Sequence, residues 1–137
     1  MPPRDGFLTV NSLRLHYLEW GEPTRPPLLL QHGFGNQAHI WDPFAATVAD
    51  RYHVFALDSR GHGDSDHADD YGDELNASDT LAACEALGLQ RLTLIGFSMG
   101  GANALICVSR RPELVERLVL VDRGPDSDPR GRERMAR

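Results

Sequence analysis

The sequence has few of the features that mark secreted, membrane-bound or disulfide-stabilised proteins. Its 137 residues include only two cysteines, too few for a disulfide framework. Cys84 and Cys107 fall in apolar helical patterns, so we expect both to be reduced core residues. No apolar run approaches the roughly 18 residues of a membrane-spanning helix. Prolines and charges in Met1–Gly6 stand where a signal peptide would be apolar. We therefore expect a cytoplasmic protein with no membrane partner.

The chain also lacks an excess of positive charge. It has 20 acidic residues against 14 lysines and arginines, a formal net charge of -6 at pH 7. A nucleic-acid surface needs clustered positive charge to neutralise phosphates. The histidines and acids lack the spacing of a metal site such as HExxH on one helix face. We expect a small-molecule substrate, with no nucleic-acid partner, no metal and no cofactor.

What the chain does contain is an alternation of short apolar runs with apolar stripes at helical spacing. Strands are expected at Phe7–Val10, Leu13–Trp20, Pro27–Gln31, His53–Asp58, Leu92–Ile95 and Arg117–Val121. Helices are expected at Asp42–Val48, with Asp42 as N-cap and Pro43 after it, at Ala77–Leu87 and at Ser98–Arg110. This order predicts an α/β fold: a mostly parallel sheet of about six strands, opened by an antiparallel hairpin and flanked by helices on both faces. Ligands of such sheets bind at the carboxyl ends of the strands.

One motif with a chemical meaning lies between the fifth predicted strand and the helix after it. Gly96 and Gly100 flank Ser98 in a GxSxG sequence. A strand that turns into a helix within a residue or two presents such a serine hydroxyl in strained geometry, with no side chains crowding the turn. The pattern therefore favours Ser98 as a nucleophile. The alternative is a glycine-rich turn whose serine only caps the helix.

A second motif, His32-Gly33-Phe34-Gly35, directly follows the third predicted strand. Acyl transfer builds negative charge on an oxygen, and two backbone N–H groups aimed at that oxygen stabilise it. The backbone amides of Phe34 and Met99 are placed to supply them, with Gly33 and Gly35 permitting the turn. His32 is expected to hydrogen-bond the loop rather than to act as a base. The alternative is an ordinary loop between strand and helix.

A third motif runs from Asp58 to Ser65, after the fourth predicted strand. Its alternating glycines beside Asp58 and Arg60 indicate a compact loop fixed by charge-assisted hydrogen bonds. We expect a structural supporting role, and the alternative is an edge of the substrate pocket.

Together these motifs are similar to the α/β-hydrolase superfamily, in particular its serine esterase and lactonase-like branch. The resemblance rests on HGFG, DSRGHGDS, GFSMGG and LVLVDRGP, in this order, and covers nearly the whole chain. It implies Ser98 as nucleophile and the Phe34 and Met99 amides as an oxyanion hole. Members of this superfamily follow the serine with an acid and then a histidine, each after a strand. Asp122 is the candidate acid, although an aspartate there can also cap a loop.

No histidine follows Ser98 in this sequence, and all six precede it. We therefore expect residues 1–122 to be the N-terminal part of an α/β-hydrolase core and residues 123–137 to be a charged tail that starts a lid segment. A serine without a base is a poor nucleophile, so the chain alone is expected to be inactive. An edge strand left unpaired near Leu118–Val121 would favour self-association.

Two functions remain open from the sequence. The first is a serine hydrolase that cleaves a carboxylic ester or related acyl substrate through an acyl-serine intermediate. A serine in place of an aspartate at this turn disfavours epoxide hydrolysis and dehalogenation, since the members with those activities attack with a carboxylate. The second is a non-catalytic, truncated α/β-hydrolase-like protein that binds a ligand or partner.

Overall fold

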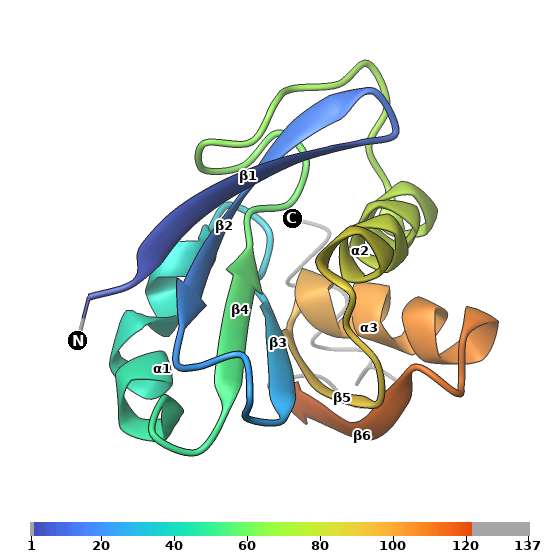
Figure 1. Cartoon of the computed structure of the whole chain (residues 1–137). Coiled ribbons are helices and arrows are strands. Elements are labelled where there is room, and N and C mark those ends of the chain that lie inside the picture. Colours follow the sequence, from blue (N-terminus) through green and yellow to red (C-terminus); the bar gives the residue numbers. More distant parts are fainter. Residues whose placement is uncertain (1, 122–137) are drawn as a thin grey trace.

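The computed structural model of the chain describes residues 2–121 and contains a six-stranded sheet with helices on both faces (Figure 1). The strands are β1 (Arg4–Val10), β2 (Leu13–Trp20), β3 (Pro27–Gln31), β4 (His53–Leu57), β5 (Leu92–Phe97) and β6 (Val115–Val121). The helices are a 3-10 turn, η1 (Ala38–Trp41), and three α-helices, α1 (Asp42–Val48), α2 (Asp73–Leu87) and α3 (Met99–Arg110). The predicted α/β fold class is confirmed.

The strands lie in the order β1-β2-β4-β3-β5-β6. β1 pairs antiparallel with β2, and β2 antiparallel with β4, whereas β4, β3, β5 and β6 are parallel. The opening hairpin turns at Asn11 and Ser12, which both have positive φ, 51° and 64°. Two consecutive residues with positive φ match the right-handed twist of the paired strands. The predicted antiparallel hairpin is therefore confirmed.

Two apolar cores form because the central strands send alternate side chains to opposite faces. Leu28 and Leu30 of β3 join the cluster under η1 and α1, whereas Leu29 between them joins the cluster under α2 and α3. Figure 1 shows α1 on one side of the sheet and α2 and α3 on the other. Cys84 and Cys107 are buried and unpaired in the second cluster, as predicted.

A buried polar network ties the two helices of this second face to the central strand. Asn103 of α3 donates to Gln31 of β3 (3.1 Å) and to Thr80 of α2 (3.0 Å), and Gln31 also donates to Thr80 (3.2 Å). These side chains are at most 2% exposed. A buried polar group without a partner is costly, so the three hold one another in place directly below the carboxyl ends of the strands.

Several element ends differ from the sequence-based boundaries. The α1 helix begins at Asp42 itself with Trp41 as N-cap, so Asp42 was wrongly expected to be the cap, and its carboxylate instead pairs with His39 (2.8 Å). The α2 helix begins at Asp73, four residues before Ala77; its first turn has three polar residues and only Leu75 as an apolar one, so the apolar stripe starts later than the helix. Acidic residues there suit the positive end of the helix dipole.

The last described strand pairs with β5 alone, and Val119 and Val121 are 44% and 39% exposed. Self-association through this edge stays a prediction.

No helix within residues 2–121 has the length and apolar character needed to cross a membrane. The expected tail, residues 123–137, lies outside the described residues.

Candidate active site

The three motifs of the sequence meet at one edge of the sheet. In the parallel registers Gln31, the last residue of β3, lies beside Leu57 on one side and Gly96 on the other. The loops that follow these residues therefore leave the sheet side by side. The candidate site consists of the turn at Ser98 and the loops that follow β3 and β4.

The chain turns from β5 into α3 at the single residue Ser98. Its φ is 54° and its ψ is -112°, a backbone conformation that a serine rarely adopts. Its carbonyl accepts the amides of Gly101 (2.8 Å) and Ala102 (3.2 Å), as an N-cap carbonyl does. Its side chain makes no capping hydrogen bond. The hydroxyl of half-buried Ser98 therefore does not cap the N-terminus of α3.

The glycines on either side of Ser98 allow the strand, the helix and the neighbouring β3 to approach closely. A Cβ atom at Gly96 would overlap the carbonyl of Gly100, and one at Gly100 would overlap the carbonyl of Gln31. Both obstacles are backbone atoms, which cannot rotate away. The turn thus requires glycine at both positions for reasons of space.

Gly100→Ala is expected to destabilise the protein by about 1–3 kcal/mol because the added methyl group meets the backbone of β3. The free energy of unfolding from urea titration measures this. At an open helical position the same change would stabilise by about 0.5–1 kcal/mol. A stabilised Gly100→Ala variant would contradict the observed packing.

The loop after β3 lies against this turn. A Cβ atom at Gly33 would come within 3.3 Å of Cβ of Ser98 and 3.0 Å of the Phe97 ring. Gly35 has a φ of 78°. Among residues 2–121, the amides of Phe34 and Met99 find no hydrogen-bond acceptor. Both N–H groups are thus available to a ligand beside Ser98, and the Met99 amide also lies at the positive end of the α3 dipole.

His32, at the start of that loop, is fully buried, and both of its ring nitrogens form hydrogen bonds. Nδ1 of His32 donates to the carbonyl of Gly33 (2.7 Å), and Nε2 accepts the amide of Ser59 (3.0 Å). This pairing requires the neutral ring, and burial lowers the pKa of His32 in agreement with it. The imidazole links the β3 loop to the β4 loop and has no free nitrogen for a serine.

Asp58 is the centre of the loop after β4. Its buried carboxylate accepts the amides of Ala38 (2.7 Å) and Asp64 (3.0 Å) and pairs with Nδ1 of His16 (2.7 Å). His16 also contacts the carboxylate of Asp5 through Nε2 (2.6 Å). One carboxylate therefore joins β2, the β4 loop and η1.

The same cluster can be considered as a metal site. His16, Asp58 and Asp64 could present ligand atoms within 4.8 Å of one another. Both Asp58 oxygens, however, already accept hydrogen bonds from protein donors. The cluster is therefore accounted for by its internal pairing, and the absence of a metal stays a prediction.

His16 makes stability depend on pH. Burial lowers its pKa, but hydrogen bonds to Asp5 and Asp58 outweigh this and raise it above 6.5. The stabilisation is thus complete below pH 6.5 and is lost as pH rises through the folded-state pKa. We expect the difference in unfolding free energy between wild type and His16→Gln to shrink from about pH 6 to about pH 9. Urea titrations across this range would contradict the account if the difference grew with pH.

Arg60, two residues after Asp58, forms a buried ion pair with Asp79 of α2. Nε and Nη2 of the guanidinium donate to the two carboxylate oxygens at 2.7 and 2.8 Å, and Nη1 donates to the carbonyl of Asp70 (2.9 Å). The side chains are 7% and 2% exposed. The hydrogen bonds to Asp79 raise the pKa of Arg60, so the pair is charged. It fastens the β4 loop to α2.

A cavity of about 680 Å³ lies between these loops and the start of α2. Its wall includes Phe34 and Met99, the two residues with free amides, together with His62, Tyr71 and Asn76. Asn76 is 5% exposed, and its Oδ1 has no hydrogen-bond partner among the described residues. Met99, the residue after Ser98, therefore borders a space of substrate size, although Ser98 itself is not part of the wall.

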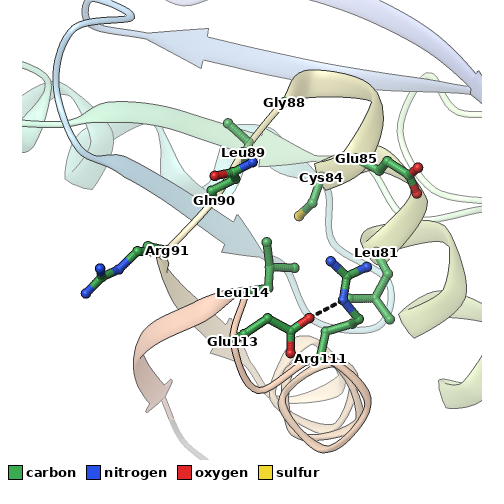
Figure 2. A pocket seen from close by; sticks show the side chains of 10 residues that line it. All are labelled: Leu81, Cys84, Glu85, Gly88, Leu89, Gln90, Arg91, Arg111, Glu113 and Leu114. Carbon is green, nitrogen blue, oxygen red and sulfur yellow. Dashed lines mark hydrogen bonds and ion pairs between the residues drawn. The ribbon is translucent and has the colours of Figure 1, made fainter.

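A smaller hollow of about 300 Å³ lies at the other end of the sheet, where α2 leads into β5 and α3 into β6 (Figure 2). Arg111 and Glu113 form an ion pair at it (2.6 Å). Burial raises the pKa of Cys84 there to about 12, so the thiol is protonated and a poor nucleophile. Cys84 therefore supplies no activated nucleophile to this hollow.

The structure brings together all but one of the site residues expected from sequence. Asp122 follows β6, which ends beside Phe97, but lies outside the described residues. Sequence reasoning missed His16, Asn76 and Asp79. For the last two a signal existed: both occupy core-facing positions of α2 beside Ala77 and Thr80, where polar residues need a specific reason.

The chain matches a known protein family over most of its length. The family described as alpha/beta hydrolase fold matches residues 26–135. The chain belongs to the α/β-hydrolase fold family. As a member of that family it places Ser98 at the turn where α/β hydrolases carry their nucleophile.

Several curated relatives of this α/β hydrolase are known. An uncharacterized protein of Mycobacterium tuberculosis is 36% identical over 90% of this chain and 36% of its own length. The mouse sn-1-specific diacylglycerol lipase ABHD11 is 37% identical, over 77% of this chain and 35% of its own. Mouse epoxide hydrolase 4 is 32% identical, over 82% and 32%. The chain thus spans about a third of the length of these relatives.

Solved structures agree on the fold. An alpha/beta hydrolase from Novosphingobium aromaticivorans superimposes with a TM-score of 0.90 at 32% identity, covering 98% of this chain and 49% of its own. A membrane phospholipase A superimposes with a TM-score of 0.89 at 37% identity, covering 93% and 42%. The described sheet is therefore the incomplete α/β-hydrolase core predicted from the motifs.

Proposed function

We propose that this α/β hydrolase is a serine hydrolase that cleaves a carboxylic ester or related acyl substrate. The observation that carries the proposal is Ser98: it occupies a one-residue turn with a φ of 54°, and its hydroxyl makes no capping hydrogen bond. A residue held in a rarely populated conformation, with a hydroxyl that caps no helix and with its neighbour Met99 on the wall of a cavity, is typical of a catalytic position.

In the proposed reaction the Ser98 oxygen attacks the acyl carbon. The negative charge that develops on the carbonyl oxygen is stabilised by the free amides of Phe34 and Met99. The alcohol leaves, an acyl-serine forms, and water then releases the acid. Both proton transfers need a base, which we place outside residues 1–137, because residues 99–137 contain no histidine and both nitrogens of His32 are engaged. Asp122 is proposed as the acid that orients this base.

Ester cleavage is favoured over the other activities found among the relatives. The relatives include an enzyme named as a diacylglycerol lipase and others named as epoxide hydrolases. A serine hydroxyl attacks an acyl carbon readily once a base is present, and it yields an acyl-enzyme that water can open. The Phe34 and Met99 side chains add apolar surface to the cavity wall, which suits an acyl substrate.

A serine-directed fluorophosphonate probe tests the proposal. We expect the full-length protein to be labelled and the Ser98→Ala variant not to be. Phosphonylation requires an activated hydroxyl. The test can therefore be made before the natural substrate is identified. Full-length protein that folds and is not labelled would overturn the proposal and favour a non-catalytic binding role.

A further inference from the structure

His62 joins the two loops that border the nucleophile turn. Its Nε2 accepts the amide of Gly35 at 3.2 Å, and its Nδ1 donates to the carbonyl of Arg60 at 3.0 Å. A carbonyl can only accept and an amide can only donate, so these two partners fix the neutral ring with its proton on Nδ1. One imidazole thus connects the loop after β3 to the loop after β4.

The ring is supported on both sides. It lies 5.0 Å from the His32 ring and 5.7 Å from the Phe34 ring, centroid to centroid, with Phe34 meeting it edge-on. Its carbonyl partner belongs to Arg60, whose guanidinium is held by Asp79 of α2. His62 therefore connects Gly35 to the buried ion pair between Arg60 and Asp79 of α2.

This contact affects which amide of the loop faces a substrate. Phe34 and Gly35 are consecutive, and a peptide segment with both amides free could rotate to present either. His62 occupies the Gly35 amide and leaves the Phe34 amide without an acceptor among the described residues. Gly35 has a φ of 78°, a conformation that glycine reaches without strain, and the amide of Asn36 closes a turn on the carbonyl of Gly33 (3.1 Å), so the contact with His62 is a second restraint on this loop.

We propose that neutral His62 is a positioning residue for the oxyanion hole: it holds the Gly35 amide so that the Phe34 amide points at the reacting carbonyl. The proposal rests on the proposed function and adds the residue that orients this donor. A ring with hydrogens on both nitrogens could not accept from Gly35, so the contact requires the neutral tautomer with its hydrogen on Nδ1.

Other charged and titratable groups surround the ring. They are His32 from the β3 loop, Asp58 and Arg60 from the β4 loop, and Tyr71 and Asp73 at the cavity wall. His62→Gln separates the effect of His62 from theirs, because its amide oxygen can accept from Gly35 at any pH while the neighbours are unchanged. His62→Leu removes the acceptor altogether.

Ester hydrolysis by the full-length protein tests the proposal. We expect His62→Leu to lower kcat by about 10²-fold with little change in KM, since the misplaced donor acts on the transition state. His62→Gln should keep most of kcat, because its amide oxygen can still accept from the Gly35 amide. Wild-type kcat in His62→Leu, or an equal loss in both variants, would overturn the proposal.

A second readout does not depend on catalysis. In the Ser98→Ala background, the amide signal of Gly35 in ¹⁵N–¹H NMR should move in His62→Leu, which removes its acceptor, and should stay near its wild-type position in His62→Gln. If wild type neither hydrolyses esters nor reacts with the fluorophosphonate, the proposed function fails, and this signal still reports whether His62 holds the loop. A Gly35 signal that is the same in wild type, His62→Gln and His62→Leu at all pH values would exclude the contact.

Discussion

Replacing Ser98 with alanine is expected to lower kcat for ester hydrolysis by the full-length protein on the order of 10⁶-fold. The reason is chemical, because the variant keeps the amide donors and the cavity but has no atom that can form the acyl-enzyme. Removing the hydroxyl should not unfold the protein, since it makes no capping hydrogen bond. Hydrolysis of a chromogenic ester, with the unfolding free energy measured in parallel, shows whether the loss is catalytic.

Ser109→Ala provides the matched control. Ser109 lies on α3, the helix that follows Ser98, and its exposed hydroxyl donates to the carbonyl of Ile106 (2.8 Å). This variant should retain wild-type kcat. If Ser98→Ala kept even a tenth of the wild-type rate while folded, the role of Ser98 as nucleophile would be wrong.

Arg60→Met is expected to destabilise the protein by about 3–5 kcal/mol, the usual result of leaving one buried partner of an ion pair alone. Among residues 2–121, the carboxylate of Asp79, 2% exposed, would retain only the hydrogen bond from Asn11 (2.8 Å). The β4 loop would also lose its attachment to Asp70. Urea titration of the full-length variant measures the loss.

Two further variants identify its cause. Arg111→Met breaks an exposed ion pair with Glu113, in which the two side chains are 47% and 66% exposed, and should change the unfolding free energy far less than Arg60→Met does. Adding Asp79→Leu to Arg60→Met removes the unpaired charge and should recover part of the stability. A double variant no more stable than Arg60→Met would show that the lost contacts, rather than the buried charge, dominate.

The sequence predicted the fold well wherever the signal was local. The buried runs at β3 and β4, the GxSxG turn and the helical stripe at Ala77 each depend on residues within a few positions of one another. Boundaries were wrong at Asp42 and Asp73, and also at Arg4 and Val115, where β1 and β6 begin before the predicted Phe7 and Arg117. Charged residues begin the element at Asp42, Asp73 and Arg4, so the apolar pattern gives little information there.

The parts of the site that could not be predicted are pairings between distant segments. His16 meets Asp58 across 42 residues, Arg60 meets Asp79 on another element, and His62 reaches back to Gly35. Each pairing requires the strand order β2-β4-β3, which places later segments beside earlier ones. The spacing of residues along the sequence does not indicate this strand order.

The central claim is that Ser98 becomes acylated during turnover. The direct measurement is mass spectrometry of the full-length protein, quenched in acid within the first turnover of an activated ester and digested to peptides. The account predicts one acyl group per molecule, on the peptide that contains Ser98, and none in the Ser98→Ala variant. Hydrolysis that proceeds without an acylated Ser98, or with the acyl group on another residue, would contradict it.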